Sequence, residues 1–357
     1  MIRFAHASYA AFVLLTGAVF GSAPSASAEE TAAAGPLTIL VHGGAGAMEK
    51  GKYTPEQESQ FKADLAAALE AGYAVLEAGG DSLDAVTTAV VMLEDSPHFN
   101  AGRGAVFTRD GKNELDASIM DGETLNAGAI AGVTRVKNPV KLARAVMENS
   151  EHVMLIGDGA ETFAKEQDLD FVSPKYFRTE TRWKAYQARL EQEKAAEKAA
   201  KEAERQGRLA PRYTPPHAEK YGTVGAVALD SNGNLAAATS TGGMMMKRYG
   251  RVGDVPIVGA GVYANDASCA VSSTGWGEYF IRLSVAREIC AQVEYQGKSV
   301  VAAADDVIHN RLETLGGDGG VIVLGPDGAH AMTFNSKGMF RGVLTAGGAP
   351  EVAIYAE

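Results

Sequence analysis

The sequence has 357 residues, of which 46% are hydrophobic and 22% are charged, and its formal net charge is −11. This composition is typical of a globular protein and excludes a collagen-like, coiled-coil or largely disordered chain. An acidic chain without a basic face lacks the phosphate contacts that nucleic-acid binding requires, so we expect no nucleic-acid partner. The 41 glycines gather in short clusters beside Thr, Asp and Asn, a pattern typical of backbone that lies close to a ligand.

The N-terminus has the features of an export signal. Arg3 precedes a short apolar run over 10–20, and a small-residue A-x-A cleavage site at 26–28 precedes Glu29. The apolar run is too short to cross a bilayer, and no later segment reaches the roughly 18 to 20 apolar residues of a membrane helix. We therefore expect a signal peptide over residues 1–28, no membrane partner and a periplasmic location.

The first half of the remaining chain predicts helices beside buried strands. Apolar residues recur at helical spacing in two consecutive stretches, and Asp81 or Ser82 is the residue type that caps the second. Asn138 and Pro139 are typical of another helix N-terminus. The expected elements are a strand over 37–42, helices over 61–76, 83–93 and 138–147, and a strand over 152–156.

Between residues 178 and 220 the composition changes sharply. Residues 184–208 combine helix formers and charges with few large apolar side chains, which predicts a solvated helix. Residues 211–220 contain three prolines and cannot continue that helix, so they indicate a linker. A coiled-coil arm is the alternative, but the alanines keep no heptad seam.

The second half is rich in predicted strands. Two apolar runs are joined by Asp230-Ser231-Asn232-Gly233, a strong hairpin signal. Strands and helices on both sides of the linker indicate two sheets packed between helical layers. The expected strands cover 223–229, 235–241, 257–263, 269–273, 320–324 and 329–334, with helices over 278–293 and 300–315.

The two cysteines, Cys269 and Cys290, have the option of pairing in an oxidising compartment. Cys269 lies in a predicted strand and Cys290 in a predicted helix, which favours two buried free thiols.

Common catalytic signatures are absent from the sequence. It contains no G-x-S-x-G elbow, no H-E-x-x-H or C-x-x-C pair and no phosphate-binding loop. None of the seven histidines is spaced like a ligand pair on one helix face, so we expect no zinc site. Catalysis must then come from hydroxyls, backbone amides and a few charged groups.

Thr223 stands where the linker meets a predicted strand. A threonine there can attack the carbonyl of Gly222, form an ester and release a new N-terminus, and glycine permits the close approach. The freed α-amine, with an ordinary pKa of about 7.7, can act as general base to its own hydroxyl. The alternative is an ordinary strand beginning.

Three neighbouring segments suit this chemistry. Residues 239–243 bring hydroxyls to the end of the hairpin partner strand, and 273–278 join a strand to a helix N-terminus whose amides can hold an oxyanion. Arg251 and Asp254 match the carboxylate and ammonium of an amino-acid head group. The alternative for this pair is a surface ion pair.

Seven blocks of sequence together carry a family resemblance. They are residues 42–46, 99–106, 114–117, 222–225, 239–243, 250–254 and 273–277. In this order they resemble the plant-type L-asparaginases, or isoaspartyl peptidases, which are N-terminal nucleophile (Ntn) hydrolases. The resemblance implies an α+β fold, a four-layer αββα sandwich. It also implies one globular domain cut into an α subunit over 29–222, with the linker at about 178–222, and a β subunit over 223–357, assembled as a dimer of such heterodimers.

The resemblance assigns catalytic roles to five residues. It implies that Thr223 is the nucleophile, freed by cleavage after Gly222, and that Thr241 hydrogen-bonds it. Thr274 and Gly275 match the oxyanion hole. Asn100 matches an asparagine near the nucleophile.

It also assigns substrate and ion contacts. Arg251 and Asp254 match the anchors of the substrate's α-carboxylate and α-amine, to which Gly275 and Gly277 add backbone contacts. Trp276, where a smaller polar residue is common in the family, is expected to reshape the leaving-group side. A structural sodium ion is implied, with backbone ligands from Leu93, Glu94, Ser96, Phe99, Ala101 and Arg103.

The implied activity is hydrolysis of isoaspartyl dipeptides and of L-asparagine through a β-aspartyl ester on Thr223, without an organic cofactor or a catalytic metal. A glycosylasparaginase is the alternative within the fold, but Asp is expected there at the position of Gly222. An exported amino-acid-binding protein that uses Arg251 and Asp254 without turnover is the alternative from another class.

Overall fold

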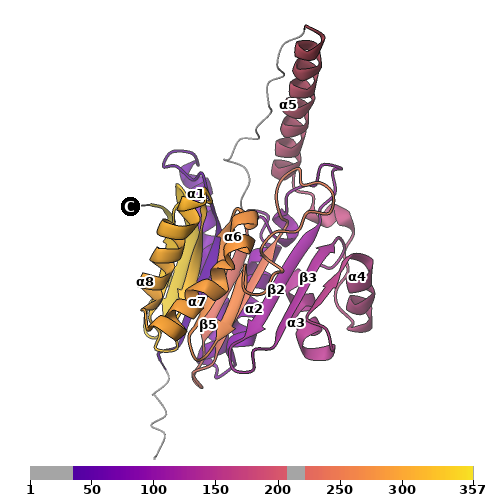
Figure 1. Cartoon of the computed structure of the whole chain (residues 1–357). Helices are drawn as coiled ribbons and strands as arrows, with labels where there is room; N and C mark the ends of the chain where they lie inside the picture. Colours follow the sequence, from indigo (N-terminus) through magenta and orange to yellow (C-terminus); the bar gives the residue numbers. More distant parts are fainter. Residues whose placement is uncertain (1–34, 207–221, 357) are drawn as a thin grey trace, which may run out of the picture. The chain divides into compact units, whose positions relative to one another are not determined.

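The computed structural model describes residues 35–206 and 222–356, which form two β-sheets with helices packed against them (Figure 1). The predicted signal peptide and the proline-rich segment 211–220 lie outside the described residues. The mixed α and β composition and the two sheets expected from the sequence are confirmed. None of the helices in the described part is long and apolar enough to span a membrane.

The larger sheet has eight strands and the smaller sheet four. The larger runs, in spatial order, β12 (Glu351–Tyr355), β11 (Gly338–Thr345), β1 (Thr38–Gly46), β5 (Val224–Leu229), β6 (Leu235–Thr241), β2 (Leu115–Asp121), β3 (Ala127–Val133) and β4 (Met154–Ile156). The smaller runs β10 (His330–Phe334), β9 (Gly319–Leu324), β8 (Cys269–Gly275) and β7 (Val262–Asn265). Neighbouring strands are antiparallel except β3 and β4.

The helices connect these strands. They are α1 (Pro55–Glu77), α2 (Ser82–Asp95), α3 (Pro139–Asn149), α4 (Gly157–Glu166), α5 (Glu180–Arg205), α6 (Gly277–Leu283), α7 (Val285–Gln296) and α8 (Val300–Asp305). A π-helical segment, η4 (Asp306–Leu312), follows α8, and two short 3-10 segments occur at η1 (Gly102–Gly104) and η2 (Pro174–Phe177).

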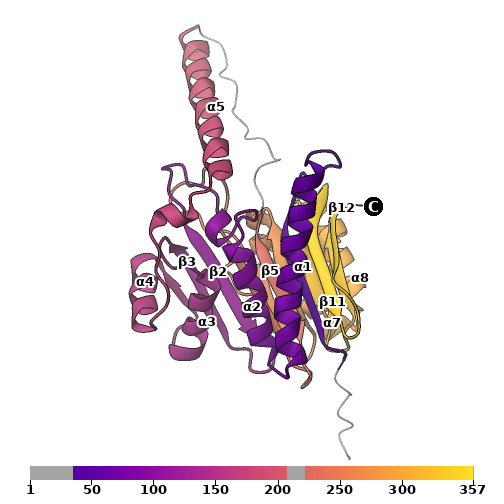
Figure 2. The ribbon, with the colours of Figure 1, turned by 180° about the vertical axis from the view of Figure 1, so that it is seen from behind.

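Helices α1 and α2 pack against the larger sheet, as Figure 2 shows. The Thr54 side chain and the Gln57 side chain form a reciprocal capping box at the start of α1. Asp81 caps α2 and accepts a hydrogen bond from the backbone N of Asp84 at 2.6 Å, as the sequence predicted. Both helices bury aliphatic stripes against β1, β5, β6 and β11, which fixes the outer face of that sheet.

Helices α7 and α8 pack against the smaller sheet and lie in front of it in Figure 1. Their core includes Phe280, Ile289 and Val321. A separate apolar cluster joins residues of both sheets, among them Leu40 of β1 and Ile322 of β9. The two sheets therefore pack directly on each other. Strand β5 belongs to the larger sheet, where β1 and β6 are its neighbours.

Several element boundaries differ from the prediction. Left-handed backbone at Ser284, with φ 50°, divides the expected helix over 278–293 into α6 and α7. The strand expected over 257–263 begins only at Val262, because residues 257–261 make turns that include Gly259 at φ 92°. Strands β2, β3, β11 and β12 were not predicted. Alanine, glycine and polar residues interrupt the apolar alternation of β2, β3 and β11, whereas β12 is a short run of five residues that is apolar after Glu351.

The charged helix predicted after residue 184 is confirmed as α5, which begins at Glu180. Its first turns dock on the body of the protein, because the rings of Trp183 and Tyr186 contact Phe107 with centroid distances of 5.2 and 5.4 Å. Most later residues of α5 are exposed, as expected for a helix that lacks large apolar side chains.

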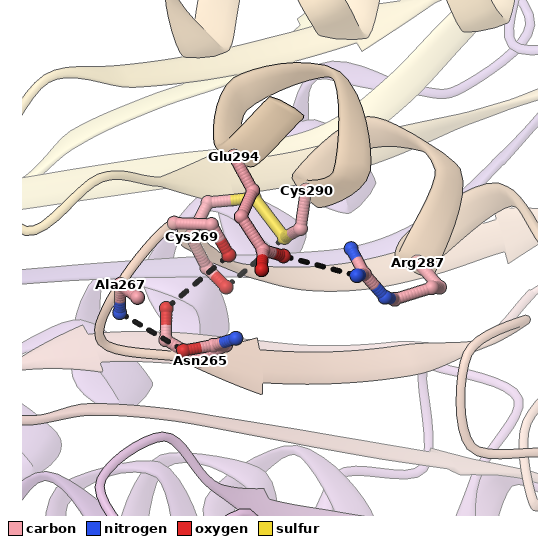
Figure 3. Close-up of a disulfide and its surroundings, with 7 residues drawn as sticks. Asn265, Ala267, Cys269, Arg287, Cys290 and Glu294 are labelled. Atoms are coloured by element: carbon pink, nitrogen blue, oxygen red, sulfur yellow. Dashed lines mark hydrogen bonds and ion pairs between the residues drawn. A yellow bond between two sulfur atoms is a disulfide. The ribbon is translucent and has the colours of Figure 1, made fainter. Parts of the chain in front are cut away.

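The prediction of two free thiols is wrong, because Cys269 and Cys290 form a disulfide (Figure 3). Cys269 begins β8, and Cys290 lies on the buried face of α7, which packs on that strand. Their Cα atoms are 5.3 Å apart, within the range that a disulfide requires. The sequence placed each cysteine in the right kind of element, but it did not show that the two elements pack together.

We expect Cys290→Ser to lower the free energy of unfolding by roughly 3 kcal/mol, because the crosslink closes a loop of 21 residues in the unfolded chain. Urea unfolding of oxidised wild type and variant measures this change. The double variant Cys269→Ser/Cys290→Ser is the control and should match the single variant. Two titratable thiols in denatured, unreduced wild-type protein would contradict the assignment.

Candidate active site

The junction of Gly222 and Thr223 lies at the start of β5, between β1 and β6. Thr223 is buried, and its Oγ1 donates a hydrogen bond to Thr241 Oγ1 at 3.3 Å. Thr241 Oγ1 in turn donates to the carbonyl oxygen of Gly222 at 3.1 Å and accepts from the backbone N of Gly243 at 3.0 Å. A chain of two hydroxyls therefore leads from the Thr223 side chain back to the preceding carbonyl.

Asn100 holds the same carbonyl from the other side. Its Nδ2 donates to the Gly222 oxygen at 2.6 Å and to the Gly243 oxygen at 2.8 Å, while its Oδ1 accepts from the backbone N of Val106 at 2.8 Å. The Gly222 oxygen thus has two donors, from Asn100 and Thr241. This is the arrangement that stabilises negative charge when a carbonyl is attacked.

The end of β1 lies in close contact with the Gly222–Thr223 peptide bond. The register of β1 shifts between His42 and Gly44, and Gly44 has φ +116°. A Cβ on Gly44 would lie 2.8 Å from the Gly222 Cα and 3.3 Å from the Thr223 nitrogen, so only glycine permits this approach. The glycine cluster of residues 42–46 therefore brings backbone against the Gly222–Thr223 peptide bond.

His42 is a residue of this site that the sequence analysis did not assign. Its Nδ1 lies 2.9 Å from the carbonyl oxygen of Thr223 and its Nε2 lies 2.7 Å from Ser272 Oγ. A carbonyl only accepts, so Nδ1 carries the proton and Ser272 donates to Nε2. Burial lowers the His42 pKa to about 3, against the hydrogen bond to Thr223, so the ring is neutral. Through these two hydrogen bonds the His42 ring links β1 and the start of β5 to β8.

A small pocket beside Thr223 contains the expected head-group anchors. It is lined by Gly222, Thr223, Thr241, Gly243, Met244, Arg251, Gly253, Asp254, Val255 and Gly275. Asp254 is buried, and its Oδ2 has no hydrogen-bond partner in the described part of the chain. Burial raises the Asp254 pKa to about 7, although the Arg251 charge opposes this shift. A buried carboxylate with a free oxygen suits an ammonium ligand.

Arg251 has a competing partner that the sequence analysis missed. Its Nε and Nη2 donate to the two carboxylate oxygens of Glu278, each at 3.0 Å, in a bidentate pair. Glu278 lies in the first turn of α6 and about half of its side chain is exposed. A ligand carboxylate at Arg251 therefore has to displace or share this carboxylate.

The segment from β8 into α6 brings the remaining predicted residues to this region. Gly275 lines the pocket, whereas Thr274 is fully buried beside it, with Oγ1 3.3 Å from the backbone N of Ala45. Gly277 packs against Arg251 and Asp254. Trp276 packs edge-on against Tyr279 at 5.0 Å and is not among the residues that line this pocket.

The residues predicted to bind sodium run from the last turn of α2, which contains Leu93 and Glu94, through the following turn to Arg103 in η1. The Glu94 carboxylate faces elsewhere: its Oε1 accepts from Ser240 Oγ at 2.6 Å and from the backbone N of Val140 at 3.0 Å. Burial raises the Glu94 pKa to about 8. The Glu94 and Phe99 carbonyl oxygens lie close to glycines of this segment: a Cβ on Gly102 would overlap the Glu94 oxygen, and a Cβ on Gly104 would overlap the Phe99 oxygen. Side chains do not offer an alternative, because no three His, Cys, Asp or Glu residues of the described ranges cluster as metal ligands.

A sequence profile of the family described as asparaginase matches residues 35–354. The chain belongs to the asparaginase family. The family resemblance inferred from the seven sequence blocks is therefore confirmed.

Individual members of the asparaginase family are similar over most of their length. The isoaspartyl peptidase of Escherichia coli K12 is 50% identical over 323 residues, covering 90% of this chain and 97% of that protein. A putative isoaspartyl peptidase/L-asparaginase of Dictyostelium discoideum is 47% identical over 86% of this chain and 92% of its own. A probable isoaspartyl peptidase/L-asparaginase 2 of Arabidopsis thaliana is 40% identical, covering 90% of this chain and 99% of its own.

Gly225 provides a test of the packing around His42. A Cβ on Gly225 would overlap Ser272 Oγ and lie 2.6 Å from His42 Nε2. We expect Gly225→Ala to lower the free energy of unfolding by about 1–3 kcal/mol, measured by urea denaturation. The control is Gly159→Ala in α4, where a Cβ meets no atom within 4 Å, and it should be neutral or stabilising. Equal stabilities of Gly225→Ala and wild type would contradict this packing.

Proposed function

We propose that this protein is an isoaspartyl peptidase and L-asparaginase that matures by cutting itself before Thr223. The observation that carries the proposal is the position of the Thr223 hydroxyl. It is joined through Thr241 to the Gly222 carbonyl, and it opens onto a pocket that contains Arg251 and Asp254. Family membership and the names of its relatives support the same activity.

In the maturation step, Thr223 Oγ1 attacks the Gly222 carbonyl carbon. Asn100 Nδ2 and Thr241 Oγ1 donate to the oxygen that becomes negative. The bond from the Gly222 carbon to the Thr223 nitrogen breaks as the ester to Oγ1 forms, and the hydroxyl proton ends on that nitrogen. Water then hydrolyses the ester, which leaves a Gly222 carboxylate and a free Thr223 α-amine, the ends of an α subunit (29–222) and a β subunit (223–357).

In the catalytic cycle, the Thr223 α-amine takes the proton of its own hydroxyl. The oxygen attacks the β-carbonyl of the substrate, and Thr274 with the backbone N of Gly275 holds the oxyanion. The amine returns the proton to the leaving nitrogen, which departs as ammonia or as an amino acid. Water then hydrolyses the β-aspartyl ester and releases L-aspartate. The cycle uses protein groups and water throughout.

The pocket accounts for selection of the aspartyl head group. Arg251 binds the α-carboxylate after Glu278 gives way, and the free oxygen of Asp254 accepts from the α-ammonium, beside Gly277. A glycosylasparaginase is less favoured, because Gly222 stands where Asp is expected. An amino-acid-binding protein without turnover needs no donors on the Gly222 oxygen, yet two are present.

Further proposals concern the whole protein. We infer a four-layer αββα sandwich, which the packing of helices on both sheets supports. We also infer a dimer of α/β heterodimers, export to the periplasm through residues 1–28, and a structural sodium ion in the turn after α2. Backbone oxygens of the six predicted residues suit a sodium ion, because a hard cation prefers oxygen ligands.

The first test is the intact mass and N-terminal sequence of the purified exported protein. We expect two fragments, one starting at Glu29 and one starting at Thr223, because attack by Thr223 breaks the bond before it. Thr223→Ala should remain a single chain without L-asparaginase activity. An intact, folded wild-type chain after long incubation would contradict the proposed function and favour the binding-protein alternative.

The raised pKa of Asp254 predicts how activity depends on pH. Below about pH 7 its carboxyl is protonated and cannot pair with an ammonium, so kcat/KM for L-asparagine should rise as pH increases through about 7. A bound substrate keeps Asp254 ionised, so this titration should be missing from kcat, whereas titration of the Thr223 amine affects both. Identical pH profiles of kcat and kcat/KM in wild type would contradict this role of Asp254. Asp254→Asn is the control, and in this variant the two pH profiles should no longer differ.

A further inference from the structure

A second cavity, of about 590 Å³, adjoins the reacting centre. Gly222 lines both this cavity and the head-group pocket, and Asn100, which holds the Gly222 carbonyl, lines it too. The mechanism above gives this cavity no role, and L-asparagine, whose leaving group is ammonia, has nothing to place in it.

One wall of this cavity is aromatic. Tyr53, Phe61, Phe99 and Phe340 line it and pack on one another, with ring centroids 4.8 Å apart for Phe61 and Phe340 and 5.0 Å apart for Tyr53 and Phe61. These rings come from α1 and its preceding loop, from the turn after α2, and from β11. The wall suits an apolar group of the size of an amino-acid side chain.

Arg182, from the first turn of α5, lines the same cavity as a cation without a counter-ion. Its Nε donates to the Gly104 carbonyl at 2.9 Å and its Nη2 to the His98 carbonyl at 3.3 Å. No carboxylate of the described residues pairs with it, and burial lowers its pKa. Nη1 has no acceptor there, so the guanidinium can still bind a carboxylate.

We propose that this cavity binds the leaving residue of an isoaspartyl dipeptide, with its apolar side chain on the aromatic wall and its α-carboxylate on Arg182. The inference rests on the proposed function. The leaving nitrogen takes its proton from the Thr223 α-amine, which is the atom bonded to Gly222 before the cut. The leaving residue must therefore lie beside the position that Gly222 occupies before the cut, and Gly222 lines this cavity. The site selects dipeptides with a free C-terminus and an apolar second residue.

The test uses mature wild-type enzyme and compares isoaspartyl-leucine with isoaspartyl-leucinamide, which lacks only the terminal charge. We expect kcat/KM to be at least about tenfold lower for the amide, because it loses a charge-assisted hydrogen bond to Arg182. In Arg182→Gln the two substrates should differ by less than about twofold. The matched control is Arg178→Gln: the Arg178 guanidinium stacks 3.8 Å from the centroid of the Trp183 ring, outside the cavity, and this variant should keep the wild-type ratio.

The outcomes separate the two proposals. Wild-type enzyme that hydrolyses both dipeptides equally well overturns the leaving-residue site and leaves the function intact. Enzyme that hydrolyses neither a dipeptide nor L-asparagine overturns the function itself. Should Arg182→Gln fail to mature, the comparison of isoaspartyl-leucine with its amide in wild-type enzyme still decides. The aromatic wall is tested separately: isoaspartyl-lysine should be a poorer substrate than isoaspartyl-leucine.

Discussion

The two hydrogen bonds to the Gly222 carbonyl oxygen are the interaction on which the rest of the site depends. Its oxygen accepts from Asn100 in the turn after α2 and from Thr241 at the end of β6. The next carbonyl, that of Thr223, accepts from His42 on β1. Both carbonyls that flank the Thr223 side chain are therefore fixed from three separate elements. A hydroxyl beside a peptide bond becomes a directed nucleophile only when the bond is held in this way.

Buried ionisable side chains of this molecule serve either as structural links or as parts of a binding site. Glu94 is fully buried, but one of its oxygens joins α2 to β6 and to the start of α3, and it lines neither cavity. Glu94 Oε2 and Asp254 Oδ2 both lack a hydrogen-bond partner among the described residues, but only Asp254 lines a cavity. Arg182 is partly buried on the wall of the larger cavity, where its guanidinium donates only to backbone carbonyls. Burial of an ion without a partner is costly, so these two positions favour ligands of opposite charge.

The second sheet and its helices support this chemistry from behind. Strand β8 carries Ser272, which fixes the His42 ring, and continues to Thr274 and Gly275. The disulfide joins the start of this strand to α7, so one covalent link and one hydrogen-bond chain position the same strand. The first turns of α5 position a residue of the larger cavity in a comparable way. Trp183 and Tyr186 dock this mostly solvated helix on Phe107, and Arg182, from the same turns, lines the cavity.

Sequence alone determined the family, the two-sheet organisation, the Asp81 cap of α2 and the residues around Thr223, because these depend on local spacing and on motifs that follow one another along the chain. It did not determine the disulfide or the pairing of Arg251 with Glu278. It also did not determine the hydrogen bonds of His42 or the position of Arg182 on the larger cavity. Each of these is a contact between elements far apart in the chain: His42 and Ser272 are separated by 230 positions. Only tertiary packing brings such groups within hydrogen-bonding distance, since no local periodicity records which strand or helix will lie opposite.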